Sequence, residues 1–380
     1  MNRDSDDLSL VLSGGGAHAA YQVGFLRYLA GRYPRLRIPI LTGISAGAIN
    51  AAFIANHQGT FKEAIAALCD FWSRLDIAQV YRADAPSLLK SLLRLGVHLF
   101  TAGRPQSPVP KGLVDTAPLR RLLETGFLSP NGRLAGIGEN IRRQKLKAVA
   151  ITATNYTTGQ AVTWVQGKDI EMWERPDRHG MMTELTVDQI MASSALPILF
   201  PAIGIGGAWY GDGGIRQYAP LSPSLHLGAA RIMAVSTHYR PSSQEAGGAV
   251  QHGYPSLARI MDILMSAIFI DLLEQDLLGL ERVNQLLDRE PREDHSPLRL
   301  VRAFTLCPSV NLGLLAGGSE PDLPRPFRFL TRGLGTRKSG SFDWVSMLMF
   351  DRRYVKQLMD IGEADARAQK EKIEAFLADA

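Results

Sequence analysis

Two short stretches near the start of the chain decide its fold: Leu8–His18 (LSLVLSGGGAH) and Ile38–Gly47 (IPILTGISAG). In the first, an apolar strand ends in three glycines and is followed, from Ala19 to Ala30, by apolar residues at helical spacing. In the second, a strand over Ile38–Thr42 leads through a glycine-framed turn into a helix of small residues over Ala48–Asn56. Two consecutive strand–turn–helix units predict a parallel sheet. We therefore expect a three-layer α/β/α fold with a mainly parallel central sheet.

The rest of the chain is expected to continue this fold in two parts. Residues 1–240 are predicted to form the core domain, with a helical and flap insertion at about 60–130, and residues 241–380 a mostly helical C-terminal extension packed on it. Two strands around a turn predict a hairpin or meander beside the sheet, and two later runs predict further strands. These four segments are Lys147–Asn155, Ala161–Val165, Ala229–Thr237 and Leu298–Thr305.

Composition describes an ordinary globular protein, with 46% hydrophobic and 21% charged residues. The acidic start MNRDSDDLSL differs from a secretory signal, so a cytoplasmic protein is expected. The most apolar stretch, Leu257–Leu280, carries five charged residues and does not predict a membrane-spanning helix. A net charge of +5 falls short of a nucleic-acid-binding signature, while weak attraction to an anionic membrane surface is compatible with it.

The cysteines and other metal-ligating residues predict no metal site and no cofactor. Cys69 and Cys307 lie far apart in unrelated contexts and are expected to be free thiols. No cluster of His, Cys or Asp has the spacing of a metal-ligand set.

The pattern G-x-S-x-G stands at Gly43–Gly47, between a predicted strand and a predicted helix. A serine on such a sharp turn adopts a strained backbone and presents its hydroxyl at the positive end of the following helix. Ser45 is therefore a candidate nucleophile. The alternative is an ordinary turn of glycine and serine, because the pattern alone is common.

A second glycine-rich turn, Ser13–His18 (SGGGAH), precedes the serine. Consecutive glycines let backbone N–H groups point at a ligand, which suits an oxyanion hole or an anion nest. The spacing matches neither a P-loop nor a dinucleotide fingerprint, which argues against a phosphate site. His18 is a candidate donor to a substrate oxygen when protonated, with capping or packing at the helix start as the alternative.

A third motif, Tyr210–Gly214 (YGDGG), frames Asp212 with glycines. Taken alone, such an aspartate predicts a solvated turn. In company with a serine elbow it becomes a candidate base, because an ionised carboxylate beside the Ser45 hydroxyl accepts its proton during attack on a carbonyl.

In this order the three motifs resemble the patatin-like phospholipase family, which combines a glycine-rich oxyanion loop, a G-x-S-x-G serine and an Asp-Gly-Gly aspartate. The resemblance runs from Leu8 to about Thr237 and implies a patatin-like catalytic core with a Ser45–Asp212 dyad that needs no histidine. It also implies that ASSALPILFP (192–201) supports the aspartate loop. The implied oxyanion residues are Gly14, Gly15, Gly16 and Ala17. The implied supporting residues are Gly43, Gly47, Gly213, Gly214 and His18.

The chain departs from the family pattern at two places. The family usually continues the glycine loop with Arg or Lys and then Gly, where this chain has His18-Ala19. It often carries an Asn shortly after Asp-Gly-Gly, where Tyr218 stands here. The first departure bears on anion or head-group contacts near the loop, and the second on a hydrogen bond behind the aspartate.

The expected function is lipid degradation by a phospholipase A or lysophospholipase type of acyl hydrolase, working through an acyl-enzyme on Ser45. The expected substrates are phospholipids, lysophospholipids or other acyl esters, met by peripheral membrane contact through the Leu-rich segment Ser87–Phe100. No nucleic acid partner is expected.

Two alternatives stay open. One is an α/β-hydrolase-type esterase with a Ser-Asp-His triad, and the other is a non-catalytic lipid-binding or regulatory protein of the same fold. The histidines that qualify for a triad by their position after the acid are His226, His238, His252 and His295. The sequence leaves open the lipid, the acyl position, chain-length preference, hydrolysis against acyl transfer, and the oligomeric state.

Overall fold

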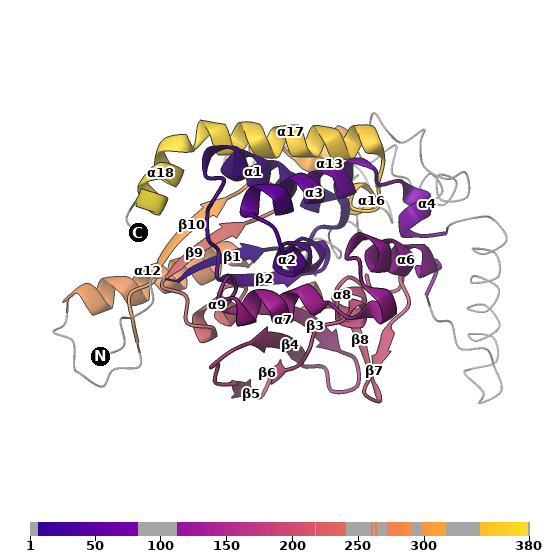
Figure 1. Cartoon of the computed structure of the whole chain (residues 1–380), viewed down its shortest axis with the longest axis horizontal. Helices are drawn as coiled ribbons and strands as arrows, with labels where there is room; N and C mark the ends of the chain where they lie inside the picture. The colour runs from indigo at the N-terminus through magenta and orange to yellow at the C-terminus, as the bar shows by residue number, and fades with distance from the viewer. Residues whose placement is uncertain are drawn as a thin grey trace.

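A computed structural model describes residues 7–82, 112–216, 218–240, 260, 263, 272–289, 298–316 and 343–378. In these ranges ten strands form one sheet in the order β10-β9-β1-β2-β3-β4-β6-β5, and the β7–β8 hairpin joins it through β3 (Figure 1). The strands are β1 (Leu8–Leu12), β2 (Ile40–Ile44), β3 (Ala148–Asn155), β4 (Ala161–Gly167), β5 (Glu174–Arg175), β6 (Arg178–Met182), β7 (Ile203–Ile205), β8 (Ala208–Asp212), β9 (Arg231–Val235) and β10 (Arg302–Leu306).

The centre of the sheet is parallel. β1 pairs in parallel with β2 on one side and β9 on the other, so that Leu10 lies opposite Leu41 and Met233. β2 pairs in parallel with β3, and β9 with β10. Antiparallel pairs occur where β3 meets β4 and β8, in the β7–β8 hairpin and between β5 and β6. The prediction of a mainly parallel central sheet is confirmed.

Helices cover both faces of this sheet, because its strands alternate their side chains between two cores. Leu10 and Leu12 of β1 belong to the larger core, whereas Val11 belongs to the smaller one. The helices on the larger core are α1 (Ala19–Arg32), α2 (Ala46–Asn56), α3 (Phe61–Ser73), α4 (Ile77–Val80), α6 (Ala117–Gly126), α7 (Ala135–Arg142), α8 (Val187–Ser193), α13 (Leu312–Leu315), α16 (Asp343–Ser346), α17 (Arg352–Ala368) and α18 (Lys370–Ala378). Those on the smaller core are α9 (Ser222–His226) and α12 (Leu273–Arg289). The three-layer prediction is confirmed.

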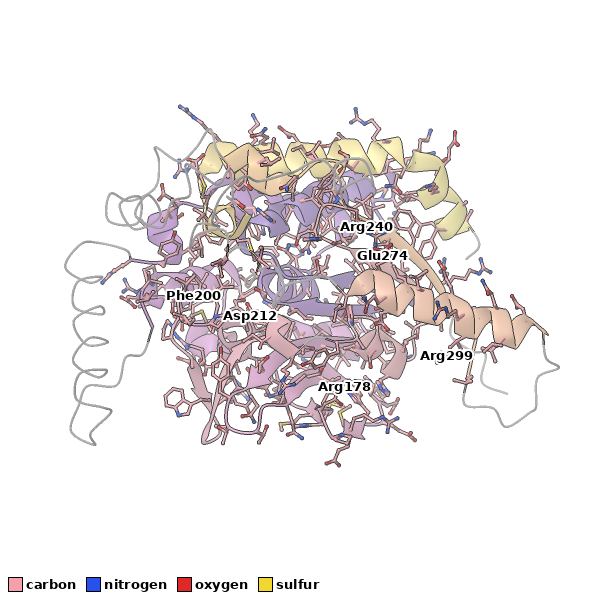
Figure 2. All side chains as sticks on the ribbon, turned by 180° about the vertical axis from the view of Figure 1, so that it is seen from behind. Arg178, Phe200, Asp212, Arg240, Glu274 and Arg299 are labelled. Atoms are coloured by element: carbon pink, nitrogen blue, oxygen red, sulfur yellow. The ribbon has the colours of Figure 1, made fainter. Side chains whose placement is uncertain are left out.

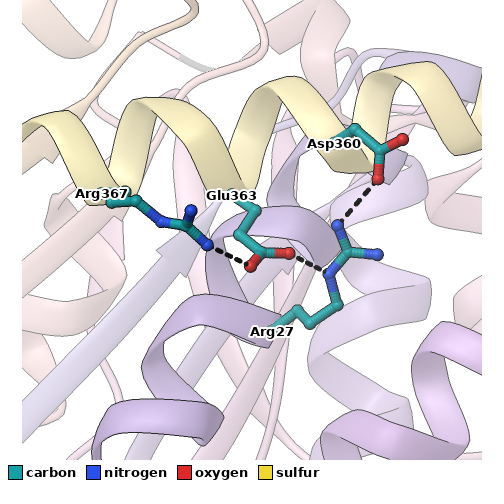
Figure 3. A network of polar contacts seen from close by, with 4 residues as sticks. All are labelled: Arg27, Asp360, Glu363 and Arg367. Carbon is teal, nitrogen blue, oxygen red and sulfur yellow. Dashed lines mark hydrogen bonds and ion pairs between the residues drawn. The ribbon is translucent and has the colours of Figure 1, made fainter.

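The C-terminal helix α17 lies along α1, although more than 300 residues separate them in sequence (Figure 1). The helices approach closely because glycines face the partner backbone: a Cβ on Gly24 would collide with the Met359 carbonyl oxygen, and one on Gly362 with the Tyr21 carbonyl oxygen. At the rim of the contact, one Arg and one Glu connect the two helices (Figure 3). The ion pairs are Arg27 with Asp360 (2.9 Å), Arg27 with Glu363 (2.5 Å) and Arg367 with Glu363 (3.0 Å).

Several expectations differ from the structure or fall outside its described part. β3 and β4 form the predicted hairpin, but β3 is also a member of the central sheet, and β5 to β8 were not predicted at all. The division at residue 240 stays a prediction, although β10 and α17 pack into the same sheet and core. The Leu-rich segment 87–100 lies outside the described residues. None of the described helices combines the length and apolar character needed to cross a bilayer.

Candidate active site

Ser45 sits on a strained turn between β2 and α2. Its backbone has φ 53° and ψ −131°, a positive φ that non-glycine residues rarely adopt. The glycines of the motif make the turn possible: a Cβ on Gly43 would lie 2.5 Å from the Gly47 carbonyl oxygen, and one on Gly47 would collide with the Leu12 and Ser13 carbonyl oxygens. The elbow is therefore wedged against the end of β1.

Two serines of the ASSALPILFP segment hold the Ser45 backbone from both sides. The Ser45 N–H donates to the Ser193 hydroxyl (2.9 Å), which itself donates to the Thr152 carbonyl oxygen (2.6 Å). The Ser194 hydroxyl donates to the Ser45 carbonyl oxygen (2.9 Å). Because all these groups are buried, the bonds fix the position of the strained residue.

Asp212 is the last residue of β8, where it lies opposite Ala153 of β3. Its N–H donates to the Ala195 carbonyl oxygen (2.9 Å), and its carbonyl oxygen accepts from the Thr154 hydroxyl (2.8 Å). A Cβ on Gly213 would collide with the Thr152 carbonyl oxygen. The 192–201 segment thus contacts both Ser45 and Asp212, and Figure 2 labels Asp212 and Phe200 in the same region of the molecule.

Burial dominates the electrostatics of the Asp212 carboxyl. The side chain is fully buried, which raises its pKa to about 7, while the Ser45 hydroxyl and the Gly214 N–H act in the opposite direction. Oδ1 accepts a 2.8 Å hydrogen bond from Gly214 N–H. Oδ2 is buried and makes no hydrogen bond of regular geometry, so the contact with the Ser45 hydroxyl is loose. Such contacts often tighten only when substrate binds.

The glycine loop lies directly over Ser45. A Cβ on Gly14 would be 3.0 Å from Ser45 Cβ, and Gly15 and Gly16 have φ of 142° and 55°, values that favour glycine. Within the described residues, the N–H groups of Gly14, Gly15 and Gly16 donate to no other group. Three main-chain donors beside the serine are thus free to bind an anion.

The last residue of the loop behaves differently. The Ala17 N–H donates to the Met347 carbonyl oxygen (2.8 Å) and is therefore occupied in this structure. His18 is buried, and its Nε2 shares a 2.8 Å hydrogen bond with the Ser346 hydroxyl. Burial, with a further contribution from His238, lowers the pKa of His18 to about 3, so its ring is neutral at ordinary pH. Of the two alternatives for His18, the structure provides packing and hydrogen bonding rather than a cation.

An apolar cavity opens beside Ser45. It has about 460 Å³ of empty space, part of it open to solvent, and Gly16, Ser45 and Ala46 lie on its wall. The remaining walls are mainly aliphatic and aromatic. They include Ile49, Trp72, Leu119, Leu122, Phe200 and Phe350. This cavity suits an apolar chain attached to a group that reacts at Ser45.

The triad alternative finds no support in the described part of the chain. His226 stacks on Trp173, with ring centroids 4.6 Å apart, on the opposite face of the sheet. His238 is exposed and follows β9. Neither is hydrogen-bonded to Ser45 or Asp212, and His252 and His295 lie outside the described residues. Across the described ranges, no group of three or more His, Cys, Asp or Glu side chains could hold a metal ion.

The structure brings together the three motifs that the sequence singled out, but other contributors were missed. The sequence flagged the 192–201 segment without assigning roles to Ser193 and Ser194. Nothing near Met347 in the sequence signals a contact with the glycine loop, because the two are more than 300 residues apart. Tyr218 is exposed, and its hydroxyl accepts from Arg216 (2.9 Å).

Comparison with known proteins identifies a family. A family model described as patatin-like phospholipase matches residues 10–225, which is more than half of the chain and includes Ser45 and Asp212. No curated protein matches the chain in sequence.

Among solved structures, similarity is at the level of the fold. The human GIVD cytosolic phospholipase A2 has 11% identity and a TM-score of 0.48, with 100% of this chain and 61% of that chain covered. VipD from Legionella pneumophila has 14% identity and a TM-score of 0.35, with 93% and 67% covered. The ExoU–SpcU complex of Pseudomonas aeruginosa has 16% identity and a TM-score of 0.28, with 98% and 77% covered. The chain thus spans about three fifths of the length of the human protein.

Proposed function

Because the chain belongs to the patatin-like phospholipase family, we propose that it hydrolyses carboxylic ester bonds of acyl lipids, with Ser45 as nucleophile and Asp212 as general base. One observation carries the proposal: a strained, buried serine meets a buried carboxylate at the mouth of an apolar cavity. The proposed substrates are phospholipids, lysophospholipids or other acyl esters.

In the first half-reaction, the Asp212 carboxylate takes the proton of the Ser45 hydroxyl while Ser45 Oγ attacks the ester carbonyl carbon. The carbonyl oxygen becomes an oxyanion, which the free N–H groups of Gly14, Gly15 and Gly16 stabilise. The intermediate then collapses, the bond to the alcohol oxygen breaks, and the alcohol leaves with the proton from Asp212. The acyl group remains esterified to Ser45.

The second half-reaction repeats these steps with water. Asp212 takes a proton from a water molecule, whose oxygen attacks the acyl carbon, and a second oxyanion forms at the same N–H groups. Collapse releases the carboxylic acid, and the proton on Asp212 returns to Ser45 Oγ. A raised pKa of about 7 suits Asp212 to this task, because such a carboxylate is a stronger base than an ordinary one and is still largely ionised near neutrality.

The cavity supports an acyl lipid over a small polar ester. Its aliphatic and aromatic walls begin at Ser45 itself, so a fatty acyl chain bound there would bring its carbonyl to the serine. Peripheral contact with a lipid surface is the corresponding proposal for how the substrate is reached.

The test is a lipid panel analysed by mass spectrometry, with wild type, Ser45→Ala and Asp212→Asn. Wild type is expected to release fatty acid from at least one phospholipid or lysophospholipid, and both variants to lose at least about 10³-fold in rate. Equal turnover by wild type and Ser45→Ala would refute the assignment of the nucleophile. Binding of lipid vesicles without any turnover would favour the non-catalytic lipid-binding alternative.

A further inference from the structure

We propose that His18 and Ser346 form a positioning pair that holds the oxyanion loop (Gly14–Ala17) in the geometry needed for catalysis. This inference rests on the proposed function. It assigns a catalytic contribution to a part of the chain that lies far beyond the three motifs and outside the matched family region.

The loop is held by a segment that we call the clasp, residues Val345–Phe350. Met347 carbonyl oxygen accepts the hydrogen bond from Ala17 N–H (2.8 Å), and a Cβ on Gly16 would collide with this same carbonyl. One residue earlier, the Ser346 hydroxyl meets His18 Nε2 at 2.8 Å. Adjacent residues of the clasp thus contact three consecutive residues at the end of the loop.

The clasp itself is rigidly held. Val345, Leu348 and Met349 are buried, and the Leu348 carbonyl oxygen accepts from the Tyr81 hydroxyl (2.9 Å). Phe350 stacks on Trp72 with ring centroids 6.5 Å apart. A segment fixed in this way is able to fix what it touches.

Two long helices bring the loop and the clasp together. α1 begins directly after the loop and α17 begins directly after the clasp, and the helices pack along each other (Figure 1). At their beginnings the His18 and Tyr354 rings meet edge to face, with centroids 6.3 Å apart. Further along, Arg27 bridges to Asp360 and Glu363 (Figure 3). The helix pair therefore transmits its packing to the oxyanion loop.

A neutral histidine suits this role. Burial keeps the imidazole uncharged, so one ring nitrogen is available to hydrogen-bond the Ser346 hydroxyl and no charge is placed beside the oxyanion. His18 follows the loop directly, and rotation of its peptide would reorient the neighbouring N–H groups. Loss of alignment at an oxyanion hole lowers the rate without removing the donors themselves.

The test uses burst kinetics on a soluble p-nitrophenyl acyl ester, with wild type, His18→Ala, His18→Gln and Ser346→Ala. We expect His18→Ala and Ser346→Ala each to slow the acylation burst by about 10- to 100-fold, with KM within about twofold. Combined, the two substitutions should cost no more than the worse one alone, within about threefold, because they break one contact. His18→Gln, which can reach Ser346 with its amide, should recover to within about fivefold of wild type.

The burst amplitude separates this role from simple loss of fold, because it counts correctly folded active sites while the burst rate reports their quality. The matched control is Ser224→Ala, which removes another buried hydroxyl contact, to Ser9 (2.7 Å), at the opposite face of the sheet. Its burst rate should be unchanged. If His18→Ala does not fold, Ser346→Ala and His18→Gln carry the same test.

Three results would overturn the inference: burst rates equal to wild type in the single variants, effects that multiply in the double variant, or no recovery in His18→Gln. Absence of any Ser45-dependent turnover in wild type would instead refute the proposed function, and the inference with it.

Discussion

The Gly214 N–H donates a 2.8 Å hydrogen bond to Oδ1 of Asp212, whereas Oδ2 of the same carboxyl is buried without a regular partner. One oxygen is therefore fixed by the backbone and the other is left for the reaction. Burial raises the pKa of this carboxyl from an ordinary 3.8 to about 7. Both the pH dependence and the stability of the protein should reflect this arrangement.

The pH profile should follow ionisation of Asp212. As a base it works only when ionised, so kcat/KM should rise about tenfold per pH unit below its pKa, reach half its maximum near pH 7 and level off above pH 8. The measurement is initial rates on a soluble ester from pH 5 to 9. A flat profile down to pH 5 would show that Asp212 has an ordinary pKa or is not the base.

Asp212→Asn should stabilise the protein at alkaline pH while abolishing turnover. The folded-state pKa lies above the unfolded-state value, so the folded protein holds an extra proton between about pH 4 and 7 and wild-type stability falls as pH rises through this window. The neutral Asn avoids this loss, with a gain on the order of 1–4 kcal/mol at pH 8 and little at pH 4. Denaturant unfolding at both pH values checks it. A gain that is equal at both pH values would contradict the buried-charge account.

Ser193→Ala should impair both stability and catalysis. It leaves the Ser45 N–H and the Thr152 carbonyl oxygen without their buried partner, at a cost of about 1–3 kcal/mol, and frees the elbow to relax. We expect kcat to fall about tenfold with KM little changed. Ser73→Ala, which removes an exposed hydroxyl bonded to the Asp70 carbonyl oxygen, is the control and should stay within about 0.5 kcal/mol of wild type. Unchanged kcat in Ser193→Ala would remove the serine from the account.

Leu122→Trp should shift the preference towards short acyl chains. Leu122 is half-buried on the cavity wall, so a larger side chain there fills space that a long chain would need. We expect kcat/KM for a long-chain ester to fall at least about tenfold relative to that for a butyryl ester. Leu277→Trp, at a half-buried position in the smaller core, is the control and should leave the ratio unchanged. An unchanged ratio in Leu122→Trp would mean that the acyl chain binds elsewhere.

The helix contact of α1 with α17 should depend on glycine more than on ion pairs. Gly24→Ala forces a Cβ against the Met359 carbonyl oxygen, and such overpacking costs about 1–3 kcal/mol. Arg27→Ala removes two ion pairs at a partly exposed position and should cost less than about 1 kcal/mol. Urea unfolding of the two variants tests this order. A larger loss in Arg27→Ala would reverse it.

The sequence predicts the local parts of this site well. The elbow at Ser45 and the loop at Gly14–Ala17 each lie between one strand and the helix that follows, so glycine positions and apolar spacing within a dozen residues indicate them. The expected strands and the observed β1, β2, β3 and β9 agree closely for the same reason. Their parallel pairing follows from the strand–turn–helix connections.

The missed parts depend on contacts between distant segments. β8 is five residues long, and its pairing with β3 places Asp212 at a strand end rather than in a solvated turn. The roles of Ser193 and Met347 arise because each meets a group more than 100 residues away in sequence. No local periodicity or turn residue records such a contact, and only the assembled sheet and the α1–α17 pair create it.

The most direct test of the central claim is intact-mass spectrometry of the acyl-enzyme, trapped by acid quench during turnover of a p-nitrophenyl acyl ester. The account predicts an acyl adduct on Ser45 in wild type, none in Ser45→Ala and strongly slowed formation in Asp212→Asn. It predicts adduct formation at the wild-type rate in alanine variants of His226, His238, His252 and His295. An adduct that persists in Ser45→Ala, or that disappears in one folded histidine variant, would contradict a Ser45–Asp212 dyad.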